Sequence, residues 1–274
     1  MGIITVSREL AALGDETARE LAKCMNYRLI DKDVLEERIQ SYGVEAKKFQ
    51  KYDERKPSFF AALSQDRDDY LHYLQAAIFA EAEQGSCVII GRGANVILKS
   101  IPALISVFLS ARSEIRIERV KSYFHCDDKR AAQIIDRSDR DRIGFQRAFF
   151  DLEWGHPGNY HISLNTGIFS PTDCAEFVCS LKERLFTPET EEKNLKMLKN
   201  LALEHKIKHH MLYEKELPIR FLEILVSDDG TVTLYGTTNS QALLDASVSS
   251  AQEMAPSATV RSEIQIIREY GVMP

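Results

Sequence analysis

The chain has 274 residues, enough to bury a substantial core in one large domain or in two unequal ones. Its 35 basic and 41 acidic residues give a net charge of −6, which disfavours a general attraction to nucleic acid or anionic membranes. A hydrophobic content of 44% and a charged content of 28% are typical of a globular protein and exclude a wholly disordered or collagen-like chain.

The first part of the chain predicts a parallel α/β sheet. Apolar, β-rich runs lie at 3–7, 87–90, 104–109 and 161–164, and their near-continuous hydrophobicity is typical of strands buried on both faces. Helical patterns lie between or after them at 15–25, 66–83, 113–123 and 128–150. Strands that alternate with helices favour a parallel sheet with right-handed crossovers.

A second, smaller α+β unit is predicted towards the C-terminus. Thr187 can cap a helix that begins at Pro188. Alternating apolar residues at 222–226 and 232–234 flank the turn signal Asp228-Asp229-Gly230, and a helix at 240–254 and a strand at 260–267 follow. We therefore expect a first domain at 1–187, a connecting helix at 188–205 and a second domain at 206–274.

Cysteine usage and the absence of targeting signals favour a cytoplasmic protein. The five cysteines are odd in number and widely spaced, which favours reduced thiols over a disulfide framework. No apolar run approaches the roughly 20 residues that cross a bilayer, and the first residues lack the pattern of an export signal. His209 and His210 are adjacent and so cannot share one helix face, and we expect no metal site there.

The turn after the first strand occupies the place of a phosphate-binding loop. Such a loop uses glycines to direct backbone N–H groups at phosphate, a lysine to reach the β- and γ-phosphates, and a Ser/Thr hydroxyl to bind magnesium. Here Gly14 is the only glycine, no lysine follows, and Asp15 and Glu16 stand at the helix start. The two carboxylates favour a simple helix cap, in which position they also repel phosphate.

Several short motifs together resemble one enzyme family. They are Arg28-Leu29-Ile30-Asp31-Lys32-Asp33, Gly91-Arg92-Gly93-Ala94-Asn95, Asp139-Arg140-Asp141-Arg142 and Asn165-Thr166-Gly167. In this order, the chain over about residues 1–186 resembles the cytidylate kinase-like family of the P-loop nucleoside monophosphate kinases. The resemblance implies a P-loop kinase-like fold that transfers phosphate from ATP, with Mg²⁺, to a nucleoside monophosphate or a related acceptor.

The resemblance also implies roles for individual residues. The degenerate phosphate loop would comprise Ser7, Ala12, Leu13, Gly14, Asp15 and Thr17. Asp31 matches an acidic residue near the acceptor's sugar, although a local turn cap explains it equally well. Arg92 and the adjacent Gly93 match the acceptor site, where a guanidinium grips phosphate bidentately. Related cytidylate kinases carry Asp at the position of Gly93, so cytosine recognition is not implied.

Seven arginines gather between residues 116 and 147, where the family carries a mobile lid over the donor phosphates. Arg137, Arg140 and Arg142 are the candidates for neutralising charge on a transferring phosphoryl group. Their spacing from neighbouring acidic residues suits surface ion pairs on a solvated helix equally well. We expect Arg92, Gly14 and the 137–142 cluster to border one cavity at the carboxyl ends of the strands.

The C-terminal region, 206–274, resembles a BON domain, a small α+β binding module. The resemblance lies in Asp229-Gly230-Thr231-Val232-Thr233-Leu234-Tyr235-Gly236, a helix, and Ala258-Thr259-Val260-Arg261-Ser262-Glu263-Ile264. Six basic and nine acidic residues disfavour membrane binding by charge and favour a lid, a homodimer contact or a small-ligand sensor. Two functions stay open: a kinase, or a weakly active or inactive nucleotide-binding protein that signals through this module.

Overall fold

Five parallel strands form the sheet of the N-terminal unit in the computed structural model, which describes residues 1–44 and 65–267. The chain divides into two units, Met1–Asn194 and Leu195–Pro274. In chain order the N-terminal elements are β1 (Ile3–Arg8), α1 (Gly14–Met25), β2 (Arg28–Ile30), α2 (Lys32–Gln40), α5 (Gln65–Ala82), β3 (Cys87–Ile90), α6 (Ala94–Ile97), β4 (Leu104–Ser110), α7 (Ser113–Phe124), α8 (Asp128–Phe150), η1 (Pro157–Asn159), β5 (Ile162–Asn165) and α9 (Pro171–Leu185).

The strand order is β2-β3-β1-β4-β5, so the predicted parallel α/β sheet is confirmed. β1 lies at the centre, paired with β3 on one side and β4 on the other, and all of its residues except Arg8 are buried. β2 was not predicted: it has only three residues, of which Arg28 is exposed, and lacks an apolar run.

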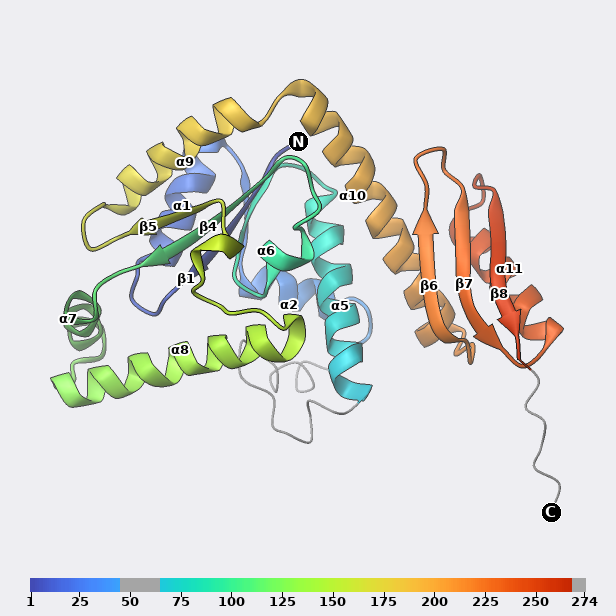
Figure 1. The fold of residues 1–274 in the computed structure, drawn as a ribbon, viewed down its shortest axis with the longest axis horizontal. Coiled ribbons are helices and arrows are strands. Elements are labelled where there is room, and N and C mark those ends of the chain that lie inside the picture. The colour runs from blue at the N-terminus through green and yellow to red at the C-terminus, as the bar shows by residue number, and fades with distance from the viewer. Residues whose placement is uncertain (45–64, 268–274) are drawn as a thin grey trace, which may run out of the picture. The chain divides into compact units, whose positions relative to one another are not determined.

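The core of this unit lies between the sheet and two helices. Side chains of β1, β3 and β4 pack against Ala18 and Leu21 of α1 and against Ala175 and Val178 of α9. Figure 1 shows α1 and α9 together on one side of the strands. Elsewhere, α5 and α8 meet through aromatic rings, with Tyr70 5.2 Å from Phe149 between ring centroids.

The sulfur atoms of Cys24 on α1 and Cys179 on α9 lie in contact across the two packed helices, with the Cα atoms 7.3 Å apart. Folding thus brings together two thiols that are 155 positions apart in the sequence, and their reduced state stays a prediction. The other cysteines are Cys87, Cys126 and Cys174.

The C-terminal unit is a three-stranded mixed sheet with its own core. Its elements are the later part of α10 (Pro188–His209), η2 (His210–Glu214), β6 (Arg220–Val226), β7 (Val232–Thr238), α11 (Gln241–Met254) and β8 (Val260–Ile266). β6 and β7 form the predicted antiparallel hairpin, and β8 pairs with β7 in parallel. The boundary after Asn194 falls inside α10, which includes the predicted connecting helix. In the described parts of both units, no helix is long and apolar enough to span a bilayer.

Candidate functional site

The candidate site lies at the carboxyl ends of β1 and β3. After β1 the chain crosses to β2 on one side of the sheet, and after β3 it crosses to β4 on the other side. Ligands of open α/β sheets bind at such switch points. The segment after β1 leads through residues 9–13 into α1, and the segment after β3 leads through Gly91-Arg92-Gly93 into α6.

The turn after β3 holds Arg92 in an uncommon backbone conformation. Gly91, Arg92 and Gly93 have φ of +69°, +56° and +68°, three consecutive left-handed residues. For a residue with a Cβ, this conformation costs roughly 1–2 kcal/mol, and such strain gathers at functional sites. Gly93 is required for a second reason, because a Cβ there would lie 2.2 Å from a ring carbon of Phe150.

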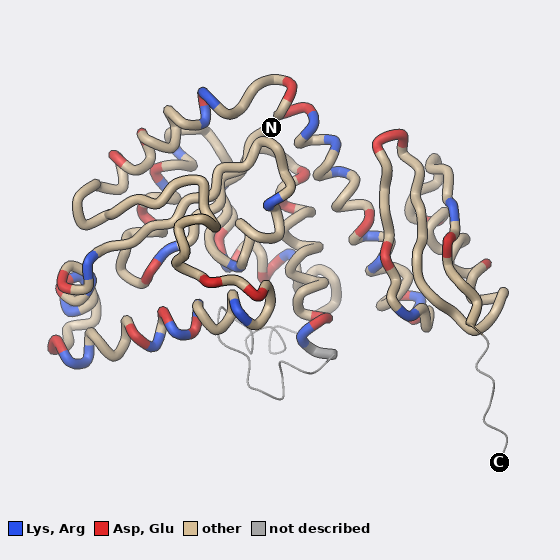
Figure 2. The backbone as a smooth tube through the Cα atoms, in the orientation of Figure 1, with Lys and Arg blue, Asp and Glu red and all other residues tan. Residues whose placement is uncertain are grey.

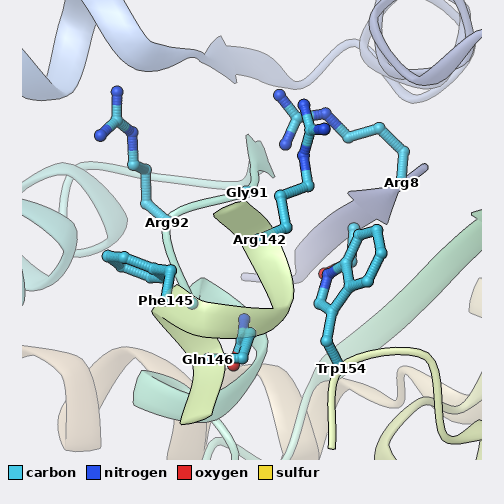
Figure 3. A pocket seen from close by; sticks show the side chains of 9 residues that line it. Arg8, Gly91, Arg92, Arg142, Phe145, Gln146 and Trp154 are labelled. Carbon is cyan, nitrogen blue, oxygen red and sulfur yellow. The ribbon is translucent and has the colours of Figure 1, made fainter. Parts of the chain in front are cut away.

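Three arginines from distant parts of the chain line one pocket at this edge. Arg8 ends β1, Arg92 follows β3 and Arg142 belongs to α8. Figure 3 shows their side chains extending to the same side, above Phe145, Gln146 and Trp154. The remaining lining residues are Ser7, Gly91 and Gly93. The cavity is small, about 10 Å³, so a phosphate ester enters only when the long arginine side chains swing outward.

Within the described residues, a carboxylate lies near each of these arginines at the edge of ion-pair distance. Arg92, only 6% exposed, lies 3.6 Å from Glu36, while Arg8 lies 3.9 Å from Asp15 and Arg142 lies 4.0 Å from Asp139. A guanidinium group can hold an incoming phosphate through two charge-assisted hydrogen bonds.

The other two predicted lid arginines do not reach the pocket. Arg137 and Arg140 are exposed on α8, and Arg140 forms an ion pair of 2.9 Å with Asp136 one turn away. Figure 2 shows basic and acidic residues alternating along this helix. Arg140 is therefore part of a surface ion pair, whereas Arg142 lines the pocket.

Two arginines of α7 hold the loop after β1. Arg116 is buried and donates to the carbonyl of Leu10 at 2.8 Å, and it forms ion pairs with Glu9 and Asp139. Arg119 donates to the carbonyl of Ala11 at 2.9 Å and also to Thr166. Burial raises the pKa of Glu9 and lowers the pKa of Arg119. Arg116 and Arg119 thus hold the loop in place through hydrogen bonds to its carbonyl groups.

The loop has left-handed backbone conformations although Gly14 is its only glycine. Ala11 and Leu13 have φ of +60° and +52°, which only glycine adopts without cost. The N–H of Leu10 donates to the carboxylate of Asp139 at 3.2 Å, so a carboxylate of α8 lies against the loop. The loop between β1 and α1 is therefore a strained turn that hydrogen bonds from neighbouring helices hold in place.

The predicted loop residues occupy different environments. Asp15 is exposed, whereas Ser7, Ala12 and Gly14 are buried. The Ser7 side chain is hydrogen-bonded to Tyr160, whose pKa burial raises to about 12. Thr17 has no exposed surface.

The fit of this loop to magnesium is poor. The hydroxyl of Thr17 donates to the carbonyl of Leu13 at 2.7 Å and has no surface that an ion could reach. The three arginines carry planar guanidinium groups, which are suited to hydrogen-bonding phosphate. Over the residues that the structure describes, no three His, Cys, Asp or Glu side chains gather as a metal site.

Asp31 caps α2. Its carboxylate accepts hydrogen bonds from the backbone N–H groups of Asp33 and Val34, at 3.0 and 3.2 Å. Asp31 therefore has a structural role as a helix cap, and its contact with an acceptor's sugar stays a prediction.

The five-stranded sheet with its helices matches the α/β fold of the P-loop kinases, with a loop between β1 and α1. Residues 3–168, more than half of the chain, match the Cytidylate kinase-like family, and the chain belongs to this family. No curated protein sequence matches the chain.

Several solved structures are similar to this chain at low sequence identity. An uncharacterized protein from Eubacterium ventriosum ATCC 27560 is 23% identical, with a TM-score of 0.53 over 67% of this chain and 99% of that one. Shikimate kinase from Bacteroides thetaiotaomicron is 14% identical, with a TM-score of 0.40 over 66% of this chain and 98% of its own. Shikimate kinase from Acinetobacter baumannii, in complex with shikimate, is 13% identical, with a TM-score of 0.39 over 67% and 94%.

Sequence reasoning missed Arg8, Arg116 and Arg119 as parts of the site. Arg8 directly follows the strand at 3–7, so an arginine at a predicted strand end was the available signal. Arg116 and Arg119 are three residues apart on one helix, a spacing that places both on one face. Neither signal indicates which loop they contact.

Proposed function

We propose that the chain is a nucleoside monophosphate kinase-like phosphotransferase that binds the acceptor's phosphate between Arg92 and Arg142. The observation that carries the proposal is the meeting of Arg8, Arg92 and Arg142 in one pocket at the carboxyl edge of the sheet. Family membership supports a kinase in general, and the pocket supports a substrate that carries phosphate.

The proposed reaction moves the γ-phosphoryl group of ATP to an oxygen of the acceptor's phosphate. The bond from the γ-phosphorus to its bridging oxygen breaks, a bond to the acceptor oxygen forms, and ADP leaves. Arg92 orients the acceptor, because the strained turn and the contact of Gly93 with Phe150 fix its backbone. Arg142 stabilises the charge on the transferring group.

ATP with Mg²⁺ is the proposed donor. Because Thr17 is buried and bonded to Leu13, no step is assigned to a magnesium ion held by that residue. Of the three predicted lid arginines the proposal keeps Arg142 alone, since Arg137 and Arg140 are exposed and outside the pocket.

A coupled assay with ATP, Mg²⁺ and each of AMP, CMP, GMP and UMP tests the proposal. We expect turnover with at least one acceptor, and Arg92→Ala to raise its KM about 10- to 100-fold, the effect of one lost charge-assisted contact. Arg140→Ala is the matched control and should change KM less than twofold, because its side chain pairs with Asp136 at the surface. Monophosphate binding by calorimetry without turnover would identify a nucleotide-binding protein instead. An unchanged KM in Arg92→Ala would refute the acceptor site.

We also propose that the C-terminal unit is a BON-like module. A hairpin turning at Gly230, a helix and a final parallel strand support this, as does Gly236, where a Cβ would lie 3.0 Å from the carbonyl oxygen of Arg220. Its proposed role is a homodimer contact or a small-ligand sensor. Sedimentation of the full chain with and without nucleotide tests the dimer.

A further inference from the structure

Gln146 places a buried amide group at the candidate pocket. It belongs to α8, lines the pocket together with Arg92 and Arg142, and is only 6% exposed. Its backbone carbonyl accepts hydrogen bonds from the N–H groups of Asp151 and Leu152 at the end of the helix. Its side-chain amide, in contrast, forms no hydrogen bond among the residues that the structure describes.

Glutamines at the surface of this protein have the partners that Gln146 lacks. Gln84 is exposed and donates to the carbonyl of Ala80 at 2.8 Å. Gln252 is also exposed, and its Nε2 donates to three carbonyl groups, those of Ala255, Pro256 and Ala258. A polar group that leaves water and gains no hydrogen bond destabilises the folded chain. A ligand that hydrogen-bonds to Gln146 would remove this penalty.

The surroundings of the amide indicate which part of a ligand it suits. Figure 3 shows Gln146 between the rings of Phe145 and Trp154, with the arginine side chains above them. Guanidinium groups only donate hydrogen bonds, and therefore suit the oxygens of a phosphate. The oxygen of an amide needs a donor, which a fully ionised phosphate does not offer. Gln146 therefore suits a neutral polar part of the ligand that carries both a donor and an acceptor.

The spacing along α8 indicates how far this part lies from the phosphate. Gln146 follows Arg142 by four residues, so the two side chains leave the same face of the helix about 6 Å apart along its axis. In a nucleoside 5′-monophosphate the ribose hydroxyls lie about one such step from the phosphorus, whereas the pairing edge of the base lies farther away. Hydroxyl groups both donate and accept hydrogen bonds, as the amide requires.

We propose that Gln146 is a specificity-determining residue that hydrogen-bonds the ribose hydroxyls of the acceptor. Its Oε1 accepts from one hydroxyl, and its Nε2 donates to the hydroxyl oxygens. This inference rests on the proposed function, in which Arg92 and Arg142 hold the acceptor's phosphate. The carboxylate of Asp31 already caps α2, whereas the amide of Gln146 is left for the ligand.

The test compares Gln146→Met with the control Gln133→Met, which makes the same change at an exposed position of α8. Methionine keeps the unbranched shape of glutamine and lacks its amide. The acceptor is the best substrate among AMP, CMP, GMP and UMP, offered in its ribo and 2′,3′-dideoxy forms with ATP and Mg²⁺. We expect wild type and Gln133→Met to favour the ribo form about 10- to 100-fold in kcat/KM, and Gln146→Met to favour it less than about threefold.

Two kinetic results would overturn the role of Gln146 while leaving the kinase standing. One is the same preference for the ribo form in Gln146→Met as in wild type, or no preference in wild type. The other is a changed ranking of the four bases with an unchanged preference for the ribo form, which would assign Gln146 to the base.

Urea unfolding without ligand, followed by circular dichroism, gives a second readout. Because no hydrogen bond is lost, Gln146→Met should leave the unfolding midpoint unchanged or raise it. A midpoint clearly below that of Gln133→Met would show that the amide has a partner in the folded chain, and would overturn the inference.

The failure of the proposed function can be distinguished from the failure of this inference. If wild-type protein shows no turnover, the proposed function fails, and calorimetry with the ribo and dideoxy forms of each monophosphate decides the role of Gln146. Loss of the preference for the ribo form in Gln146→Met but not in Gln133→Met then supports the inference. Equal affinities in Gln146→Met and wild type, or no binding by wild type, overturn it.

Discussion

Replacing Gly93 by alanine tests whether the turn that carries Arg92 depends on close packing. The new Cβ would lie 2.2 and 2.5 Å from two ring carbons of Phe150, closer than nonbonded carbons approach. It would also sit on a backbone with φ of +68°, which disfavours any residue with a Cβ. Two separate costs therefore act on one position.

The two costs can be estimated from the geometry. The left-handed backbone costs alanine about 1 kcal/mol, and forcing an extra carbon into a packed site costs about 1–3 kcal/mol. Phe150 is half-buried and its ring can shift, so the lower part of the second range applies. We expect Gly93→Ala to lower the free energy of unfolding of the N-terminal unit by about 2–3 kcal/mol.

Gly43 is the matched control for this change. Its φ is +82°, and nothing lies within 4 Å of an added Cβ, so Gly43→Ala isolates the backbone cost of about 1 kcal/mol. Urea unfolding followed by the fluorescence of Trp154 measures both variants, because this is the only tryptophan and it is buried in the N-terminal unit. Equal losses in the two variants would refute the packing argument. The monophosphate KM of Gly93→Ala should also rise, because the shift displaces Arg92.

Two further predictions concern the contact of Cys24 with Cys179 and a half-buried histidine. Without reductant the two thiols should close to a disulfide, so alkylation should label Cys126 but neither Cys24 nor Cys179. Reduction should then lower the Tm, since a crosslink across 155 residues contributes about 5 kcal/mol in the chain-entropy model. Labelling of all three without reductant would contradict the pairing. Burial lowers the pKa of His205 from 6.5 to about 4, so the unfolded state binds this proton first and stability falls as the pH drops between these values. The free energy of unfolding of the C-terminal unit, measured by amide-exchange NMR, should fall by up to about 3 kcal/mol over that range. His205→Gln should remove most of this pH dependence. The same pH dependence in His205→Gln as in the wild type would contradict the assignment to His205.

The amino-acid pattern alone determined the layout of the sheet. Apolar runs as continuous as Ile3–Arg8 and Leu104–Ser110 suit only strands covered on both faces, and helices between them require parallel crossovers. The C-terminal hairpin followed from local chemistry in the same way, because Asp229 and Gly230 favour a turn wherever they occur between alternating strands. β2 was not predicted because three residues, of which only Ile30 is buried, are too few to show a hydrophobic period.

Only the tertiary structure decided which charged residues form the site. The sequence offered seven arginines between 116 and 147 with nearly identical local surroundings, and no local rule separates Arg142 in the pocket from Arg140 in solvent. The side chains of Arg142 and Arg140 leave α8 in different directions, and the packing of α8 against the rest of the unit determines which of them faces the pocket. Arg8 and Arg92 join Arg142 because β1 and β3 are neighbours in a parallel sheet and end at the same edge. Charge and hydrophobicity can be read from single residues, whereas a binding site requires residues that are distant in sequence to lie close together, which only the folded chain achieves.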